Sequence, residues 1–245
     1  MLSIKDLVFP KTCPICDRTH KQLLTARDSD MPGICEDCEK KLIRIQSPFC
    51  AHCGKPFEAE EDSRELCADC EKTKGSWSFV QGRGLFLYTG EITQAMYRLK
   101  YSSKREYARS FAYEAYEQLG DWVTHNGIEA IIPIPLHKDR EIERGYNQAL
   151  DFAKELSKLL KVPCESDILI RVKKTIPQKQ LDDKNRLDNL KNAFHIEQKA
   201  VKYKKILLVD DIYTTGVTVS TAAECLLQYG VEAVYVMCIA IGAGD

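Results

Sequence analysis

Apolar and polar positions follow two different patterns along the chain. From Trp77 onward, short continuous apolar runs alternate with stretches in which apolar residues recur every three to four positions. Continuous runs of this length are typical of strands covered on both faces, and the longer spacing is typical of helices. Alternation of the two predicts a parallel α/β sheet.

This part of the chain is expected to contain four strands and four helices. The pattern predicts strands at 84–88, 129–133, 205–209 and 233–239. It predicts helices at 91–100, 106–119, 146–160 and 217–229.

Residues 1–75 lack such periodic runs and carry 12 Lys+Arg against 14 Asp+Glu. A segment so poor in apolar clusters buries little core, and modules of this size often depend on a metal or on disulfides. We therefore expect two domains, a metal-binding ribbon domain at 1–75 and a sheet domain at 76–245.

Composition narrows the class of protein. The 245 residues are 44% hydrophobic and 29% charged, with a net charge of −1. These values exclude a disordered chain and a strongly basic DNA-coating protein. No apolar run reaches the length of a membrane span, and the first residues lack the apolar core of a signal peptide. We expect a cytoplasmic protein.

Eight of the 11 cysteines form four Cys-x-x-Cys pairs in the first 70 residues. The pairs are Cys13/Cys16, Cys35/Cys38, Cys50/Cys53 and Cys67/Cys70. Two intervening residues let both sulfurs of a tight knuckle reach one ion, and two knuckles complete a tetrahedron around Zn²⁺. The spacing predicts two Cys₄ zinc sites in a structural role. Disulfides, redox pairs and iron–sulfur ligation are the alternatives.

The spacing does not decide which knuckles share an ion. Consecutive pairing, first with second and third with fourth, gives two ribbons, but nested pairing stays open. His20 and His52 are further candidate ligands, although eight cysteines make them unnecessary. The three remaining cysteines are expected in the core: Cys164, Cys225 and Cys238.

The most specific segment runs from Ile206 to Thr218. A buried strand ends in Asp210 and Asp211, and a hydroxyl-rich loop leads to a helix near Val217. The loop contains Thr214, Thr215 and Gly216, and Thr218 follows at the start of the helix. Free backbone N–H groups, a helix N-terminus and hydroxyls suit a phosphate, and paired carboxylates suit a ribose diol. Together they indicate a ribose 5-phosphate ligand.

This segment closely resembles the phosphoribosyl pyrophosphate (PRPP) motif of type I phosphoribosyltransferases. The resemblance implies that Asp210 and Asp211 hold the ribose hydroxyls. It implies that Thr214, Thr215, Gly216 and Thr218 hold the 5′-phosphate, and that Mg²⁺ accompanies PRPP. A plain α/β turn capped by threonines is the alternative.

The strand expected at 129–133 is followed by Pro135 and by the string His137–Gln148, which contains Arg144. Basic side chains after a strand end suit pyrophosphate, and in the phosphoribosyltransferase fold this loop faces the pyrophosphate. We therefore add Pro135 and Arg144 to the expected PRPP site. Arg144 and Asn147 could instead only cap the following helix.

Further strings extend the resemblance over nearly the whole chain. They are PIPLHKDREIERGYNQA, Lys100-Tyr101 and QKQLDDKNRLDNLKNAF, together with the cysteine ribbon. With them the chain resembles the ComF family of late competence proteins, the ComFC type. This implies a double zinc ribbon joined to a type I phosphoribosyltransferase-like domain. It also implies a role in uptake of transforming single-stranded DNA with a ComFA-type DNA-translocating ATPase, in the cytoplasm or peripherally at the inner face of the membrane.

A DNA surface is less well marked. Bases of a single strand would stack on exposed aromatics, for which Tyr97, Tyr101 and Tyr107 are candidates. Two basic stretches, Arg171–Lys184 and Lys199–Lys205, are more often solvated faces than a DNA track. Tyrosines at helical spacing are likewise more often half-buried packing residues.

Three functions follow from these features. The first is a competence protein that handles single-stranded DNA and carries a PRPP site. The second is an active phosphoribosyltransferase with an unidentified acceptor. The third is a zinc-ribbon adaptor that docks a protein partner and has a vestigial ligand site.

Overall fold

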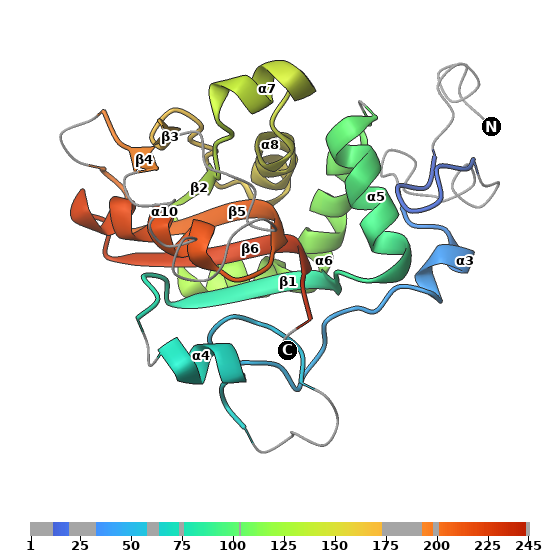
Figure 1. Ribbon diagram of the computed structural model, residues 1–245, viewed down its shortest axis with the longest axis horizontal. Helices are drawn as coiled ribbons and strands as arrows, with labels where there is room; N and C mark the ends of the chain where they lie inside the picture. Colours follow the sequence, from blue (N-terminus) through green and yellow to red (C-terminus); the bar gives the residue numbers. More distant parts are fainter. Residues whose placement is uncertain are drawn as a thin grey trace.

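A four-stranded parallel sheet forms the centre of the molecule, in the order β1-β6-β5-β2 (Figure 1). The computed structural model describes residues 12–19, 33–57, 64–73, 76–102, 104–172, 193–197 and 201–243. The strands are β1 (Gln81–Leu87), β2 (Ala130–Pro133), β5 (Lys205–Tyr213) and β6 (Ala233–Ile241). The expected parallel α/β sheet is confirmed. A second, antiparallel pair joins β3 (Ile170–Arg171) to β4 (Phe194–His195).

The two central strands are longer than the apolar pattern predicted. β5 continues through the acid pair to Tyr213, because its last residues still pair with β6, where Asp210 lies opposite Cys238 and Tyr213 opposite Ile241. On the other side of β5, Pro133 of β2 pairs with Val209. The register therefore brings the end of β2 beside the acids of β5.

Within the described residues, five helices accompany the sheet. They are α5 (Gly90–Tyr101), α6 (Tyr107–Asn126), α7 (Lys138–Arg144), α8 (Gln148–Leu160) and α10 (Val217–Gln228). α6 was expected to end at residue 119 but continues to Asn126. It is followed by Gly127, whose left-handed backbone (φ +66°) suits a helix end. α7 was not expected, since its charged sequence has no apolar face, and none of its residues is buried.

Two apolar cores lie on the two faces of the sheet, with α6 and α8 on one face and α10 on the other (Figure 1). Alternate residues of β5 divide between them: Leu207 and Val209 join the core of α6 and α8, while Ile206 and Leu208 join the core of α10. This alternation follows from the period of two along a strand. It explains why the strand sequence is apolar throughout.

The cysteine-rich segments add two short helices, α3 (Glu36–Glu39) and α4 (Ala68–Thr73). Between them, residues 43–45 run antiparallel along the free edge of β1, where Ile45 N–H donates to the Leu85 carbonyl (2.9 Å) and Leu87 N–H donates to the Ile43 carbonyl (2.8 Å). The segment between the cysteine clusters thus bonds to the edge of the sheet through an isolated antiparallel bridge between Arg44 and Phe86. The domain boundary expected after residue 75 stays a prediction.

Among the described helices, none combines the length and the apolar character that crossing a bilayer requires.

Candidate functional site

All eight Cys-x-x-Cys sulfurs gather into two groups of four. The first cluster is Cys13, Cys16, Cys35 and Cys38, and the second is Cys50, Cys53, Cys67 and Cys70. Within each cluster the sulfurs lie within 4.8 Å of one another, for example 4.0 Å between Cys16 and Cys35 and 3.6 Å between Cys53 and Cys67. Zn–S bonds of ~2.3 Å in a tetrahedron place sulfurs about 3.8 Å apart. Both donor sets fit Zn²⁺, with consecutive rather than nested pairing.

His52 belongs to neither set of four. Its Nδ1 lies 3.6 Å from the Cys70 sulfur, and its Nε2 lies 2.9 Å from the Phe79 carbonyl oxygen. The ring therefore orients a cysteine of the second cluster from outside, as outer partners of metal ligands commonly do. His20 lies outside the described residues.

The first cluster contacts α5 and α6. The Arg98 guanidinium donates to the carbonyl of Ile15, which lies between Cys13 and Cys16. Asp17, just after this knuckle, accepts a hydrogen bond from Tyr107 and pairs with Lys104 (2.9 Å). The cluster is therefore fixed to the beginning of α6 and to the last turns of α5.

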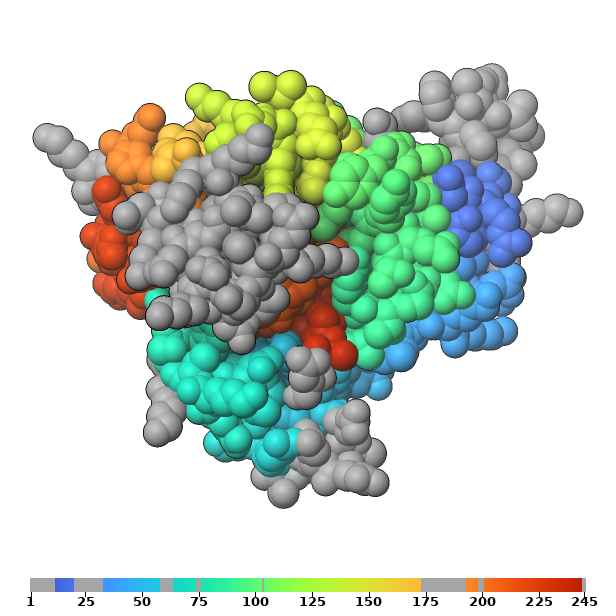
Figure 2. Space-filling view, viewed as in Figure 1, coloured from blue at the N-terminus to red at the C-terminus, as the bar shows by residue number. Residues whose placement is uncertain are grey.

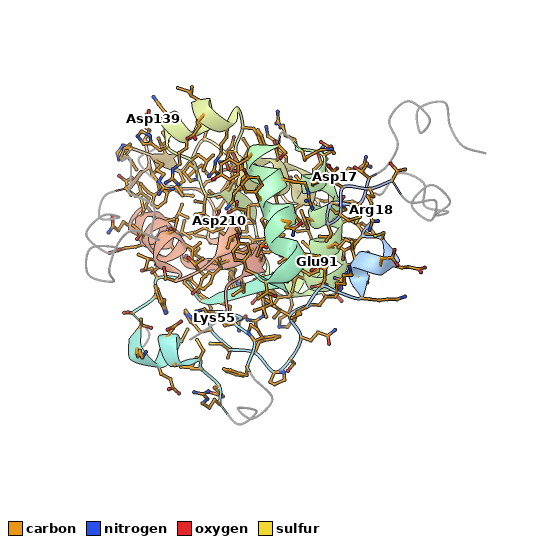
Figure 3. All side chains as sticks on the ribbon, turned by 45° about the vertical axis from the view of Figure 1, so that its right-hand side comes forward. Asp17, Arg18, Lys55, Glu91, Asp139 and Asp210 are labelled. Carbon is orange, nitrogen blue, oxygen red and sulfur yellow. The ribbon has the colours of Figure 1, made fainter. Side chains whose placement is uncertain are left out.

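The second cluster contacts β1 and the end of β5. Gly54 has a φ of +78°, and a side chain there would meet the Gly82 carbonyl of β1 at 2.6 Å. Phe79 packs edge-on against Tyr213, the last residue of β5, with ring centroids 6.4 Å apart. All four cysteines share the core that contains Tyr213 and Val217. In Figure 3, Asp17 and Lys55 mark the two ribbons on different sides of Asp210.

The acid pair lies near the carboxyl end of the sheet. Asp211 is buried, and its backbone N–H donates to the Asp210 carboxylate (2.8 Å). Burial and the neighbouring Asp211 carboxylate raise the pKa of Asp210 to about 7, against the opposing charges of Lys100 and Arg171. Near neutral pH this pair carries less than its full negative charge, which suits hydrogen bonding to hydroxyls.

Lys100 of α5 forms an ion pair with Asp211 at 2.8 Å. Although burial alone would lower the pKa of Lys100, the Asp211 carboxylate raises it above its ordinary value. Sequence reasoning quoted Lys100 within a family string and gave it no role. It also grouped Arg171 with a solvated basic stretch, whereas Arg171 is half-buried and its guanidinium lies over the Phe194 ring (5.5 Å).

The hydroxyl-rich loop joins β5 to α10. Gly216 is the N-cap of α10 with a φ of +79°, and a Cβ at this position would collide with the Tyr213 ring. The residues expected to hold phosphate line a small hollow of about 20 Å³ together with Asp210: Thr214, Thr215, Gly216 and Thr218. Backbone N–H groups at a helix start favour an anion at such a position.

Pro135 and Arg144 occupy the neighbouring strand end and its helix. Pro135 follows Ile134, whose N–H donates to the Val209 carbonyl (2.9 Å), and therefore lies beside the acid-bearing end of β5. Arg144 ends α7 and donates to Gln148 (3.0 Å) and to the Tyr101 hydroxyl (3.2 Å). The capping role falls to Asn147, whose side chain accepts the Ala149 N–H (3.0 Å). The assignment of these residues to PRPP stays a prediction.

One turn of α5 joins these parts. Arg98 reaches the first cysteine cluster, Leu99 accepts a hydrogen bond from Tyr146, Lys100 pairs with Asp211, and Tyr101 bonds Arg144. Four consecutive residues thus contact segments that are far apart in the sequence. The short string Lys100-Tyr101 was the signal for this junction.

The three tyrosines proposed to stack on bases differ in their exposure. Tyr97 and Tyr101 are 63% and 54% exposed, with ring centroids 5.0 Å apart, and Arg144 lies 5.1 Å from the Tyr101 centroid. The expectation for Tyr107 is wrong: it is 1% exposed, because α6 turns it into the core beside the first cluster. Lys173, Lys174, Lys179, Lys184 and Lys199 lie outside the described residues.

The remaining cysteines were all expected in the core. Cys238 is fully buried, whereas Cys164 and Cys225 are half-buried at the margins of the two cores. The expectation therefore holds fully only for Cys238, which lies within β6 and is covered on both faces.

A double zinc ribbon and a phosphoribosyltransferase-type α/β sheet define the class of this protein. The chain matches the family model "Double zinc ribbon domain" at residues 4–71 and "Phosphoribosyl transferase domain" at residues 147–243. Among solved structures it is similar to a purine phosphoribosyltransferase from Pyrococcus horikoshii Ot3, with a TM-score of 0.34 and 17% identity over 54% of this chain and 73% of the other.

Curated relatives cover most of the chain. "Competence protein F" of Haemophilus influenzae is 33% identical over 83% of this chain and 88% of its own. "Competence protein ComFC" of Bacillus subtilis is 29% identical over 89% of each, and "DNA utilization protein YhgH" of Escherichia coli is 29% identical over 84% of this chain and 89% of its own. The chain belongs to the ComF family of competence proteins, which confirms the resemblance drawn from its motifs.

Proposed function

We propose that this protein binds PRPP, or a related ribose 5-phosphate, at the junction of β5 and α10. The observation that carries the proposal is an acid pair, of which Asp211 is buried, followed by a hydroxyl-lined hollow at the start of α10. Asp210 and Asp211 would hold the ribose hydroxyls, and the loop of Thr214 to Thr218 would hold the 5′-phosphate.

The pyrophosphate end of the ligand would face the neighbouring cations. Lys100 is within 2.8 Å of Asp211, and the charges of Arg144 and Asp210 both act on it. Pro135 shapes the adjacent strand end. Mg²⁺, when bound, would neutralise pyrophosphate charge, since it prefers phosphate and carboxylate oxygens.

We further propose that the protein takes part in the uptake and handling of transforming single-stranded DNA, together with a ComFA-type ATPase. The names of its relatives, two competence proteins and a DNA utilization protein, support a role in DNA handling. The exposed Tyr97–Tyr101 pair would offer bases a stacking surface on α5, the helix whose Lys100 pairs with Asp211. Action in the cytoplasm, with peripheral attachment at the inner face of the membrane, belongs to the same proposal.

Calorimetric titration with PRPP and Mg²⁺ tests the ligand site. The wild-type protein should bind, and the double variant Asp210→Ala/Asp211→Ala should not. Asp121→Ala is a matched control, because Asp121 is an exposed carboxylate on α6. Binding that survives in the double variant would contradict the proposed site.

Titration with a labelled single strand tests the DNA role separately. Affinity should fall steeply with salt concentration, as counterion release requires. The paired variant Tyr97→Ala/Tyr101→Ala should weaken binding at every salt concentration, whereas Tyr116→Ala, an exposed tyrosine of α6, should not. Equal loss in both variants would remove the stacking surface from the proposal.

The alternative is turnover as a phosphoribosyltransferase. The specific observation in its favour is the concentration of cations beside the acids, which could stabilise departing pyrophosphate. Release of pyrophosphate from PRPP in the presence of nucleobases or ammonia would support this alternative. No release with any acceptor would leave ligand binding as the function.

A further inference from the structure

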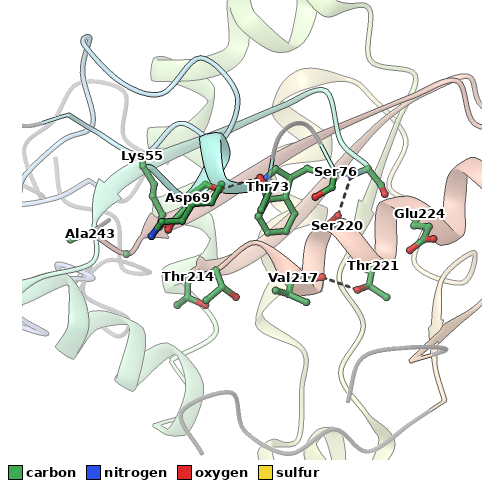
Figure 4. A pocket seen from close by; sticks show the side chains of 15 residues that line it. Lys55, Asp69, Thr73, Ser76, Thr214, Val217, Ser220, Thr221, Glu224 and Ala243 are labelled. Atoms are coloured by element: carbon green, nitrogen blue, oxygen red, sulfur yellow. Dashed lines mark hydrogen bonds and ion pairs between the residues drawn. The ribbon is translucent and has the colours of Figure 1, made fainter. Parts of the chain in front are cut away.

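A large cleft separates the second ribbon from the phosphate loop. Its volume is about 710 Å³, within the usual range for sites that hold small ligands. α4 and Lys55 form one wall, and the first turns of α10 form the other (Figure 4). The Ser78 N–H donates to the Ser220 hydroxyl (3.1 Å) and joins the two walls.

The cleft adjoins the small hollow at the start of α10. Thr214 and Thr215 line both cavities. The hollow, at about 20 Å³, accommodates only a small group such as a water molecule or part of a phosphate. A ligand phosphate held at this loop therefore has the wide cleft on its ribbon side, and there is room for a group attached to that phosphate.

The walls of the cleft are polar, with one aromatic ring. Hydroxyl groups line both walls, including Thr73 and Thr221. Lys55 pairs with Asp69 (2.5 Å) near Thr214, and Glu224 lies at the other end (Figure 4). Trp77 contributes a half-buried indole ring, whose N–H is buried and has no acceptor among the described residues. These groups suit sugar hydroxyls, phosphate oxygens and a base.

We propose that this cleft binds a nucleoside joined to the ribose 5-phosphate through its 5′-phosphate. The inference rests on the proposed ligand site and narrows its substrate class. The phosphate at Thr214 and Thr215 carries this nucleoside, whose base lies against Trp77. This chemistry has two sources: a dinucleotide such as ADP-ribose, and the 3′-terminal residue of a nucleic acid strand.

Calorimetric titration of the full zinc-loaded chain tests the proposal with three probes. They are ribose 5-phosphate, ADP-ribose and the dinucleotide adenylyl-(3′→5′)-adenosine. At least one of the two extended probes should bind about tenfold tighter than ribose 5-phosphate. Tighter binding of ADP-ribose identifies a free dinucleotide as the ligand, and tighter binding of the adenosine dinucleotide identifies the end of a nucleic acid strand.

Variants that fill the cleft provide the decisive comparison. Thr221→Trp, on the α10 wall, should abolish the gain and leave ribose 5-phosphate binding unchanged. Ser76→Trp fills the cleft from the opposite wall, where Ser76 is exposed. It should also abolish the gain in affinity, and it replaces Thr221→Trp if that variant does not fold. Gln228→Trp, exposed on α10 and outside the cleft, should keep the gain.

Two results would overturn the cleft proposal: equal affinity for all three probes, or a gain that persists in both filled variants. Failure of ribose 5-phosphate and PRPP to bind the wild-type protein at all would instead refute the underlying ligand site. The two failures are therefore distinguishable.

Discussion

The two cysteine clusters have the same ligand type and the same Cys-x-x-Cys spacing, but they contact different parts of the proposed ligand site. The first cluster lies beside α5, and Arg98 connects it to the helix that brings Lys100 to Asp211. The second cluster lies in the core on the opposite face of the sheet, with Tyr213 and the start of α10. Figure 2 shows the two ribbon segments at separate places on the surface, with α5 beside the first.

Burial also differs between them. All four cysteines of the second cluster are buried, whereas Cys16 of the first is only half-buried. A metal enclosed in a core contributes to folding of everything packed around it, whereas one at the margin mainly fixes its own loop. Identical motifs can therefore make unequal contributions to stability.

The largest expected effect separates the two clusters directly. Cys53→Ser should cost more than about 3 kcal/mol of stability, because it removes a ligand inside the core shared with Tyr213. Cys16→Ser, at the half-buried position, should cost less. Thermal unfolding with zinc analysis of each variant measures both. Equal destabilisation would show that burial does not distinguish the clusters.

The next prediction tests the packing of Tyr213, which lies in the core of the second cluster, against the loop at Gly216. Gly216→Ala should weaken PRPP binding at least about tenfold, because the new methyl group meets the Tyr213 ring and a positive φ strains it. Titration of PRPP measures this loss. Gly230→Ala is the control, with a φ of +97° and nothing within 4 Å, and should keep full affinity.

A smaller effect is expected from the contact between the first cluster and α5. Arg98→Ala should weaken PRPP binding about three- to tenfold, since α5 loses its bond to the Ile15 carbonyl and positions Lys100 less firmly. Both zinc ions should be retained. Arg105→Ala removes an exposed ion pair with Asp151 and should leave binding unchanged. Equal affinity for PRPP in both variants would show that the contact of Arg98 with the first cluster does not affect the proposed ligand site.

The last effect is on stability and not on ligand affinity, and it concerns the acid pair that lies between the two clusters. The pKa of Asp210 is raised from 3.8 to about 7, so the unfolded chain gives up this proton at a lower pH and the fold loses stability as pH rises between about 4 and 7. Without ligand, Asp210→Asn should gain about 1–3 kcal/mol at pH 8 and about half of that at pH 5.5. Unfolding at the two pH values measures it, and a pH-independent gain would contradict the raised pKa.

Local patterns in the sequence predicted most elements of the fold and the residues of the loop. The continuous apolar runs identified all four parallel strands, because both faces of the sheet are covered. α7 escaped prediction, since its helix depends on caps at His137 and Gly145 rather than on an apolar face. Tyr107 was misjudged because spacing alone does not tell which side of a helix is buried.

Sequence by itself determined the eight cysteine ligands, the acid pair and the hydroxyl loop, because each depends on residue types at short, fixed spacing. Only the tertiary structure decided which knuckles pair, that the clusters join opposite cores, and that Lys100 meets Asp211. These contacts join residues that are remote along the chain, so they depend on how helices and strands pack. The eight paired cysteines accordingly mark the two metal sites, and the fold shows what each site contacts.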